Sequence, residues 1–206
     1  MNRSPHPVSG RNRPYVGRGG QKLQAALDAF GLDVRGGVCA DFGCNVGGFT
    51  HCLLSRGAAK VYALDTGYGQ LAWTLRKDPR VVVMERTNAL YAEPPELVDL
   101  VVIDVAWTPQ ELIVPAALRW LRKADPCAPG GAVVSLLKPH YELARDEGKK
   151  PWGPLSREQA ERTCLEVCRR LHQAGCPVRA VMRSSLPGKG GNEEFFLHIA
   201  SGTVGA

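Results

Sequence analysis

The sequence predicts an α/β fold in which a mostly parallel sheet carries helices on both faces. Short apolar runs typical of buried strands alternate with stretches that have the spacing of amphipathic helices. The last two strand-like segments follow each other without a helix, which indicates an antiparallel hairpin at one edge of the sheet. The length of 206 residues suits one domain with a core large enough to cover such a sheet.

Seven segments have the composition of strands. Most are rich in valine, leucine and isoleucine, and several end at a polar residue or a glycine. Helices between the first five segments favour parallel neighbours, because parallel strands need a crossover connection. The segments are residues 38–42, 60–64, 80–85, 97–104, 132–137, 178–184 and 194–200.

Helices are expected between these strands. The first is predicted to begin near Lys22, with apolar side chains along one face, and to stop at Gly31. Lys22 then lies in the first turn, where the helix dipole disfavours a cation, which suggests a functional role. Ser156 is expected to cap a long helix that runs to about residue 173, with Glu158 or Gln159 near the position of the capping-box partner. The other helices are expected from about residue 49 and over residues 70–77 and 109–123.

Residues 139–155 are expected to form a loop. They combine prolines and glycines with a run of charged side chains, a composition typical of connections. Structureless connections of this length are usually functional or mobile, so the segment is a candidate to contact a ligand.

Composition excludes several classes of protein. No apolar run approaches the roughly 20 residues of a membrane span, and the start of the chain lacks the apolar core of a signal peptide. The seven cysteines have no disulfide-framework spacing, so we expect reduced thiols and a cytoplasmic location. Cys164, Cys168 and Cys176 are interpreted as small buried residues and not as metal ligands, because no His/Cys pair completes a site.

The first 22 residues are strongly basic. The net charge of the chain is +6, and this stretch contains no acid; its basic residues are Arg3, Arg11, Arg13, Arg18 and Lys22. Such a stretch attracts polyanions, and RNA is the natural candidate, although a solvated tail is the alternative for residues 1–13. Prolines and glycines favour a flexible arm over residues 1–14, followed by one folded domain over residues 15–206.

The stretch after the first strand has the form of a nucleotide-binding turn. Gly43, Gly47 and Gly48 allow the backbone to pass close to a ligand before a helix begins. Asp65 lies 22 residues after Gly43, at the end of the second strand, where an acid can accept the ribose hydroxyls of an adenosine. The turn lacks the Lys-Ser/Thr of a P-loop and the Gly-x-Gly-x-x-Gly of pyrophosphate binders. S-adenosylmethionine, an adenosyl cofactor without phosphates, therefore fits best, with ordinary loop structure as the alternative.

Polar residues also mark the expected carboxyl ends of the strands, where sheets of this class bind ligands. These residues are Asp41, Asp65, Asn88, Asp104 and Lys138. Asp104 and Lys138 follow neighbouring strands, beside the expected cofactor. Their position favours a role in chemistry, with a structural ion pair as the alternative.

A series of motifs, all in order, is similar to one family. The chain resembles the FtsJ-like ribose 2′-O-methyltransferases, and within them the TlyA (haemolysin A-type) group, over roughly residues 15–200. The motifs are VGRGGQKL (16–23), GGFT (47–50), DTGYGQLAW (65–73), RVVVMERTN (80–88), VIDV (102–105), LKPHYE (137–142) and KGGNEEF (189–195).

The resemblance implies a Rossmann-like, S-adenosylmethionine-dependent methyltransferase fold with a seven-stranded sheet. It also implies methyl transfer to a ribose 2′-hydroxyl of RNA, with ribosomal RNA or a ribosomal subunit as the expected partner. The catalytic set of the family falls on Lys22, Asp104, Lys138 and Glu194. Glu194 is preferred to Glu193 because the acid of the family immediately precedes the last strand.

Sites for the cofactor and for RNA follow from the turn, the strand ends and the resemblance together. Trp107 either stacks on a base or packs against the sheet edge, and His140 either contacts the substrate or lies in a surface loop. The expected RNA contacts are Arg11, Arg13, Arg18, Trp107 and His140. The expected cofactor-binding residues are Asp41, Gly43, Cys44, Asn45, Gly47, Gly48, Phe49, Asp65, Thr66, Asn88 and Asp104.

The chain departs from the TlyA group in three ways. It begins where the S4-type RNA-binding domain of the group would end, so a protein partner is a candidate source of additional RNA binding. Gly17 stands where Ser is usual, and Asp-Val-Ala-Trp at 104–107 replaces Asp-Val-Ser-Phe. Nothing in the sequence matches the association of the group with membrane lysis, and no membrane partner is expected.

The resemblance fits a simple mechanism. Lys138 is expected to accept the proton of the ribose hydroxyl, or to stabilise the developing alkoxide. A base must be neutral, and Lys22 as a neighbouring cation would favour the neutral form. Asp104 and Glu194 would orient the two amines but favour the charged form.

Other chemistries fit less well. Methylation of base amino groups commonly uses an Asp/Asn-Pro-Pro-aromatic motif, which is absent after the fourth strand. Cytosine C5 methylation needs a nucleophilic cysteine, and Cys127 precedes the fifth strand, so it is interpreted as structural. Two alternatives stay open: an RNA or ribosome assembly module that binds the cofactor with weak or lost catalysis, and a methyltransferase for a small molecule or a protein.

Overall fold

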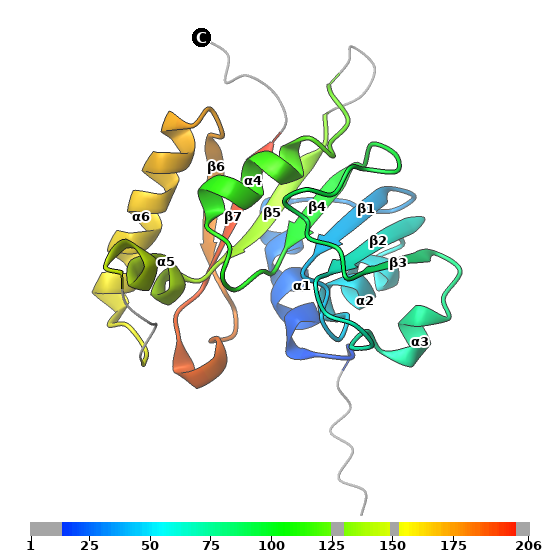
Figure 1. Ribbon diagram of the computed structural model, residues 1–206, viewed down its shortest axis with the longest axis horizontal. Coiled ribbons are helices and arrows are strands. Elements are labelled where there is room, and N and C mark those ends of the chain that lie inside the picture. The colour runs from blue at the N-terminus through cyan, green and yellow to red at the C-terminus, as the bar shows by residue number, and fades with distance from the viewer. Residues whose placement is uncertain (1–13, 125–129, 149–152, 201–206) are drawn as a thin grey trace, which may run out of the picture.

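The computed structural model describes residues 14–124, 130–148 and 153–200, and these residues form a seven-stranded sheet flanked by helices (Figure 1). The strand order is β3-β2-β1-β4-β5-β7-β6. Neighbours from β3 to β5 are parallel, whereas β7 runs antiparallel to both β5 and β6. The predicted mostly parallel sheet with an antiparallel pair at one edge is confirmed.

The strands begin and end close to the predicted positions. Their bounds are β1 Val38–Phe42, β2 Lys60–Asp65, β3 Val81–Glu85, β4 Leu100–Ile103, β5 Ala132–Leu137, β6 Val178–Arg183 and β7 Phe195–Ala200. The largest difference is at β4, for which the sequence predicts residues 97–104. Val98 instead forms an isolated bridge with Leu121, outside the main ladder.

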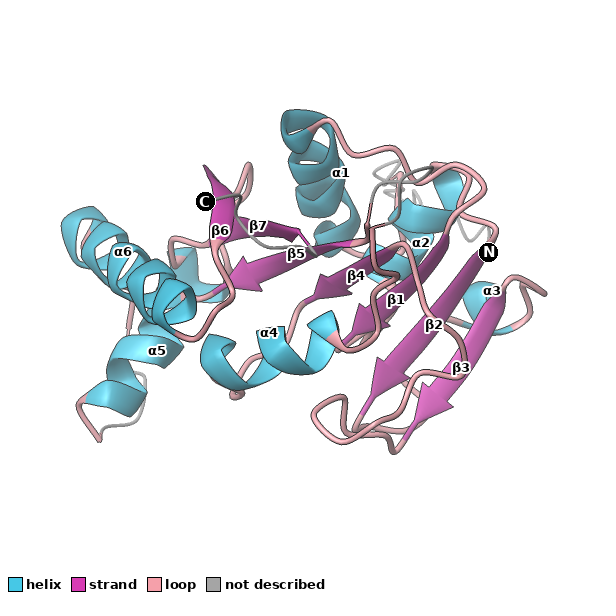
Figure 2. Cartoon of the chain, turned by 90° about the horizontal axis from the view of Figure 1, so that it is seen from above, coloured by secondary structure: helices cyan, strands magenta, loops and turns pink. Residues whose placement is uncertain are grey.

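Helices cover both faces of the sheet (Figure 2). The helices of one face are α1 Arg18–Phe30, α2 Gly48–Ser55 and α3 Trp73–Arg76, and those of the other are α4 Gln110–Leu118, α5 Pro139–Asp146 and α6 Arg157–Gln173. α3 and α4 are shorter than predicted. α4 ends early because the chain then turns Trp120 into the core, where its buried indole contacts Phe42 edge-on with 5.2 Å between ring centroids.

The start of α1 corrects one prediction. The helix begins at Arg18, so Lys22 lies in its second turn and the argument from the helix dipole was wrong. Two glycines inside the first turn explain the error, because glycine usually marks a helix end. A Cβ on Gly20 would lie 2.3 Å from the Tyr15 ring, and one on Gly19 would lie 3.3 Å from the Phe49 ring. Close packing, and not a helix end, requires glycine here.

The expected loop at 139–155 was wrong over its first half, where α5 forms. Pro139 occupies the first helical position, where its fixed φ and missing N–H are favourable. Glu142 lies in the first turn and Arg145 in the last, as the helix dipole favours. The composition that indicated a loop thus includes a proline that begins a helix.

Several other expectations concern particular residue types. Cys39, Cys44, Cys52, Cys164, Cys168 and Cys176 are free thiols, as predicted. Cys127 and residues 1–13 lie outside the described residues. Among the described helices, none is long and apolar enough to cross a membrane. The described part of the chain also contains no group of three His, Cys, Asp or Glu side chains that could hold a metal ion.

The predicted cap of α6 is present as a complete capping box. Ser156 Oγ accepts the Gln159 backbone N–H at 3.2 Å, and Gln159 Oε1 accepts the Ser156 backbone N–H at 3.1 Å. Gln159, and not Glu158, is the partner.

We expect Ser156→Ala to lower the free energy of unfolding by about 0.5–2 kcal/mol, because a backbone donor of α6 loses its acceptor. Urea unfolding followed by circular dichroism measures the change. Ser156→Asp, which restores an acceptor, is the matched control and should recover most of the loss. Equal stability of Ser156→Ala and the unchanged protein would contradict a stabilising cap.

Candidate functional site

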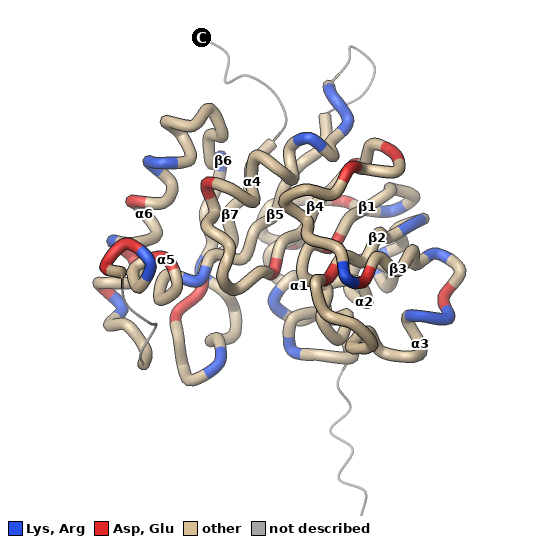
Figure 3. Tube along the Cα trace, in the orientation of Figure 1, with Lys and Arg blue, Asp and Glu red and all other residues tan. Residues whose placement is uncertain are grey.

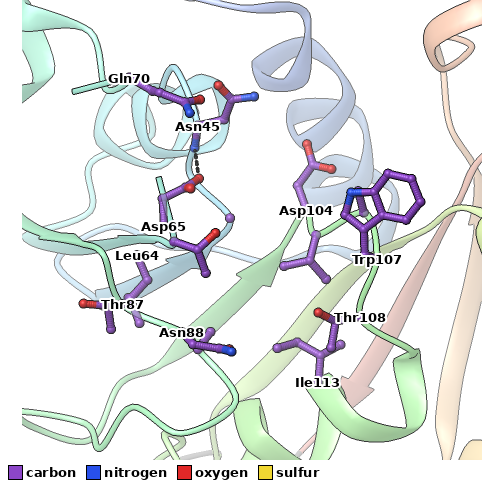
Figure 4. Close-up of a pocket in the computed structure, with 15 residues that line it drawn as sticks. Asn45, Leu64, Asp65, Gln70, Thr87, Asn88, Asp104, Trp107, Thr108 and Ile113 are labelled. Atoms are coloured by element: carbon purple, nitrogen blue, oxygen red, sulfur yellow. Dashed lines mark hydrogen bonds between the residues drawn. The ribbon is translucent and has the colours of Figure 1, made fainter. Parts of the chain in front are cut away.

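A pocket opens at the carboxyl ends of β1, β2 and β4. It encloses about 260 Å³. Its lining residues are Gly43, Asn45, Leu64, Asp65, Thr66, Gln70, Thr87, Asn88, Ala89, Asp104, Val105, Ala106, Trp107, Thr108 and Ile113. Figure 4 shows Asp65, Asn45 and Gln70 on one side of this first pocket and Asp104 with Trp107 on the other. Gly43, Asn45, Asp65, Thr66, Asn88 and Asp104, all predicted cofactor residues, are thus brought together.

Backbone donors hold the Asp65 carboxylate in place. Its Oδ2 accepts the Asn45 N–H at 2.8 Å, and its Oδ1 accepts the Gly67 N–H at 2.7 Å. A carboxylate oxygen has two lone pairs, so each oxygen keeps one acceptor position for a ligand. Two hydroxyl groups on adjacent carbons, such as those of a ribose, match this arrangement.

Five other predicted cofactor residues are buried and do not line this pocket: Asp41, Cys44, Gly47, Gly48 and Phe49. The glycines serve packing within the protein. A Cβ on Gly47 would lie 2.3 Å from Leu75 Cδ1, and one on Gly48 would lie 3.1 Å from the backbone nitrogen of Gly20. In the structure, these glycines allow close approach of α3 and α1, and their role beside a ligand stays a prediction.

Asp41 joins β1 to the start of α2. It is fully buried, and its Oδ2 accepts both the backbone N–H of Thr50 at 2.9 Å and the Thr50 hydroxyl at 2.7 Å. Its Oδ1 is buried with no hydrogen-bond partner among the described residues. Burial raises the pKa of Asp41 to about 7, against the opposing effect of Thr50.

A second pocket of about 470 Å³ adjoins the first at Trp107, which lines both. Its lining residues are Trp107, Lys138, His140, Tyr141, Gly153, Pro154, Lys189, Gly190, Asn192 and Glu194. An ion pair lies between the two pockets: Lys138 Nζ, from the lining of the second, is 2.5 Å from Asp104 Oδ1, from the lining of the first. Lys138 Nζ also donates to the Val105 carbonyl at 3.3 Å.

The four predicted catalytic residues form two ion pairs. Besides Lys138 with Asp104, Lys22 Nζ donates to Glu194 Oε2 at 2.5 Å, and both of these side chains are buried. The antiparallel register sets Leu137 opposite Phe195, so Lys138 and Glu194 emerge side by side from β5 and β7. Each lysine thus has its own acid. Glu193 lies apart, 3.5 Å from Arg183.

The turn before β7 is shaped around Glu194. A Cβ on Gly188 would lie 2.2 Å from Glu194 Oε1, so any larger residue there would displace the carboxylate. Sequence analysis assigned no role to Gly188, although its place after a proline and before two further glycines was a signal for a constrained turn.

Aromatic side chains border the second pocket. The Trp107 ring is 76% exposed and tilts against Tyr141 with 4.8 Å between centroids, so it does not pack against the sheet edge. The His140 ring also packs against Tyr141, with 4.2 Å between ring centroids. Burial, together with the charge of Lys138, lowers the pKa of His140 and favours its neutral form.

Arg18 lies at the edge of this region. It is exposed at the start of α1 and donates to the Pro187 carbonyl at 2.7 Å. The contact ties α1 to the turn that carries Gly188. Arg11 and Arg13 are outside the described residues.

A buried polar network connects the two chain segments that carry Asp104 and Lys138. Glu142 of α5 accepts the backbone N–H of Gln110, the first residue of α4, at 3.0 Å. Gln110 in turn accepts the Ser135 hydroxyl of β5 at 2.6 Å, and Arg145 lies 3.0 Å from the second oxygen of Glu142. Sequence reasoning missed Glu142, although it ends one of the quoted motifs. It is a positioning residue for both segments.

Comparisons with known proteins agree with this geometry. The profile of the family described as FtsJ-like methyltransferase matches residues 15–201, and the chain belongs to that family. It is 43% identical over 201 residues to the 16S/23S rRNA (cytidine-2'-O)-methyltransferase TlyA of Mycobacterium tuberculosis, covering 95% of this chain and 72% of that protein. It is 35% identical to Hemolysin A of Brachyspira hyodysenteriae, covering 92% of this chain and 78% of that protein. A solved structure of a candidate hemolysin from Streptococcus thermophilus superimposes with a TM-score of 0.81 at 36% identity, covering 93% of this chain and 69% of that chain.

The raised pKa of Asp41 predicts a pH-dependent stability difference. The folded protein keeps the proton up to about pH 7, whereas the unfolded chain loses it near pH 4, as an ordinary aspartate does. Ionisation of Asp41 in the unfolded chain, which the folded protein opposes, therefore lowers the stability of the fold increasingly between these values. Asp41→Asn can keep the Thr50 contacts without a charge. We expect its stability relative to the unchanged protein to rise from pH 4 to pH 7, by several kcal/mol at most, since each pKa unit corresponds to about 1.4 kcal/mol.

Urea unfolding at several pH values measures this difference, with Asp33→Asn, at an exposed aspartate, as the control. Parallel stability curves for Asp41→Asn and the unchanged protein would contradict the raised pKa.

Proposed function

We propose that this FtsJ-like protein transfers the methyl group of S-adenosylmethionine to a ribose 2′-hydroxyl of RNA, with ribosomal RNA as the substrate. The observation that carries the proposal is the ion pair between Lys138 and Asp104, which lies where the two pockets meet. A cofactor in the first pocket and a nucleotide in the second would come together at this pair. The M. tuberculosis relative is named as an rRNA (cytidine-2'-O)-methyltransferase, which supports methyl transfer to a ribose 2′-hydroxyl.

The residues of the first pocket fit an adenosyl group. Its volume of about 260 Å³ is slightly below the roughly 300–1,000 Å³ of common ligand sites, as suits a pocket open to a neighbour. Asp65 would accept the two ribose hydroxyls, while Asn45, Gln70 and Asn88 offer amide groups. S-adenosylmethionine, when bound, supplies an activated methyl group. The buried predicted residues would contribute indirectly, by packing that holds the shape of the pocket: Asp41, Cys44, Gly47, Gly48 and Phe49.

The Lys138 amine can still contact the substrate. In its charged form it has three N–H groups, of which one donates to the Val105 carbonyl, while the Asp104 carboxylate forms an ion pair with the ammonium. The amine can then act on the substrate in one of two ways. If Lys138 is charged, its N–H would stabilise the oxyanion as the bond forms, and if it is neutral, its lone pair would take the hydroxyl proton.

The pair of Lys22 and Glu194 would place a second amine and a second carboxylate beside Lys138. Lys22 was predicted as the cation that favours a neutral Lys138, and its ion pair with Glu194 at 2.5 Å would oppose that effect. We propose that Glu194 orients Lys22 and borders the ribose site, because it lines the second pocket.

On the RNA side, we propose that Trp107 stacks on a base and that His140 and Arg18 border the same strand. Arg11 and Arg13 stay predicted contacts of an arm over residues 1–14, ahead of one methyltransferase domain over residues 15–206. A ribosomal subunit as the target and a protein partner that adds RNA binding also stay proposals. The free thiols are consistent with the reducing compartment that the sequence predicts, the cytoplasm.

We expect Asp65→Asn to weaken binding of S-adenosylhomocysteine about 10- to 100-fold, because hydrogen bonds to a charged group contribute about 1.5–3 kcal/mol. Isothermal titration calorimetry measures the affinity. Asp33→Asn, at an exposed aspartate outside both pockets, is the control and should bind normally. Unchanged affinity in Asp65→Asn would remove Asp65 from the cofactor site.

We expect Lys138→Ala to reduce methyl transfer at least about 100-fold, as for loss of a general base or of an oxyanion donor, and to leave S-adenosylhomocysteine affinity nearly unchanged. The assay follows labelled methyl from S-adenosylmethionine into ribosomal RNA and into intact subunits. Alkali resistance at one dinucleotide locates a ribose methyl group. Lys123→Ala, which removes an exposed lysine that lines neither pocket, is the matched control and should transfer normally.

The outcomes separate the alternatives. Near-normal transfer by Lys138→Ala would contradict its role, and label outside ribose would contradict the reaction. Cofactor binding by the unchanged protein without transfer to any RNA would favour an assembly module with lost catalysis. RNA binding that does not weaken with salt would argue against an RNA substrate.

A further inference from the structure

An exposed aromatic and basic surface lies on the outer side of the first pocket. The loop from β2 to α3 lines the pocket with Thr66 and Gln70, while Tyr68 in the same loop is 69% exposed. Trp73, the first residue of α3, is 66% exposed. Two large rings within a short stretch are thus presented to solvent beside the proposed cofactor site.

Each ring has a cation against it. Arg86 Cζ lies 4.5 Å from the centre of the Tyr68 ring, and Lys77 Nζ lies 4.8 Å from the centre of the Trp73 ring. Among the described residues neither cation has an acidic partner within 4.0 Å, whereas their neighbours Arg76 and Arg80 are paired with Glu85 and Asp78. Figure 3 shows basic residues around α3 and at the end of β3. The unpaired charges therefore coincide with the exposed rings.

The backbone conformation at Arg86 indicates that Arg86 and the Tyr68 loop are held in a defined arrangement. Arg86 has φ of 53°, which is uncommon for a bulky residue, and its N–H donates to the Gly67 carbonyl at 3.1 Å. This contact joins the end of β3 to the loop that carries Tyr68. A strained conformation kept by a specific contact often marks a functional position.

The surface is continuous with the region proposed to hold RNA. The Ala72 N–H donates to the Val46 carbonyl at 3.2 Å, and a Cβ on Gly17 would lie 3.2 Å from Val46 Cγ2. Val46 is itself 44% exposed. Trp73 therefore connects through Val46 to the start of α1, where Arg18 is exposed.

We propose that Tyr68, Trp73, Lys77 and Arg86 bind a single-stranded segment of the RNA substrate that flanks the methylated nucleotide. The rings would stack on bases, and the two cations would contact phosphates. Stacking rings interleaved with cations are typical of sequence-tolerant binding to single strands. The inference rests on the proposed function, because it extends the same RNA across the mouth of the first pocket.

The test measures binding of a fluorescent single-stranded oligouridylate to the full chain by anisotropy at several salt concentrations. We expect Tyr68→Ala and Trp73→Ala each to weaken binding about tenfold, since stacking contributes about 1–3 kcal/mol per base. Trp73→Phe should retain most of the affinity. Arg86→Gln should lower the slope of log affinity against log salt by about one, as for one lost phosphate contact.

Two exposed residues of α6 supply matched controls. Leu165→Ala removes an apolar side chain that is 70% exposed, and Arg162→Gln removes an exposed cation. Both should bind like the unchanged protein. All variants should keep their affinity for S-adenosylhomocysteine, which shows that the fold and the first pocket are intact.

The failures of the two proposals are distinguishable. If the unchanged protein methylates RNA and Tyr68→Ala and Trp73→Ala match it in oligouridylate affinity and in KM for RNA, the surface is not an RNA contact. Weaker activity of these variants on ribosomal subunits alone, with normal binding of oligouridylate, would assign the surface to a folded part of the subunit and overturn the proposal of a single-stranded contact. No methyl transfer to any RNA by the unchanged protein would contradict the proposed function itself.

Discussion

The site depends on the antiparallel pairing of β5 with β7. This pairing sets Leu137 opposite Phe195, and the next residues outward are Lys138 and Glu194. Because a shift of one residue would reverse the direction of every side chain in the strand, register alone decides whether these two charged groups meet at the pocket or face opposite sides. The apolar faces of both strands are buried under helices, so the register is fixed by the core. A charged centre is thus held in place by hydrophobic packing.

Much of the site could be predicted because parallel strands share one edge for their carboxyl ends. Asp65, Asp104 and Lys138 follow strands that the apolar pattern identifies, and strand order does not change the edge to which they belong. The predictions that were wrong concern residues whose local sequence signals are ambiguous. The first helix was expected to begin near Lys22, after Gly20, and Pro139 was placed in a loop. Both residues instead lie inside helices, Gly20 where it packs closely against Tyr15 and Pro139 at the first helical position.

The network around Glu142 could not be predicted for a related reason. A buried carboxylate is tolerated only when donors surround it, and here those donors come from α4 and α5. Such a set is visible only in three dimensions. Its effect is to give the loop with Trp107 and the strand end with Lys138 a common support, so neither can move without exposing unpaired charge.

The ion pair of Lys22 and Glu194 joins residues 172 positions apart in sequence. Lys22 lies in α1 and Glu194 lies just before β7, so during synthesis the site cannot be completed until β7 has left the ribosome. A chain that still lacks β7 would have Lys22 of α1 without its partner Glu194. The geometry therefore restricts the complete set of four side chains to chains in which β7 has already been synthesised.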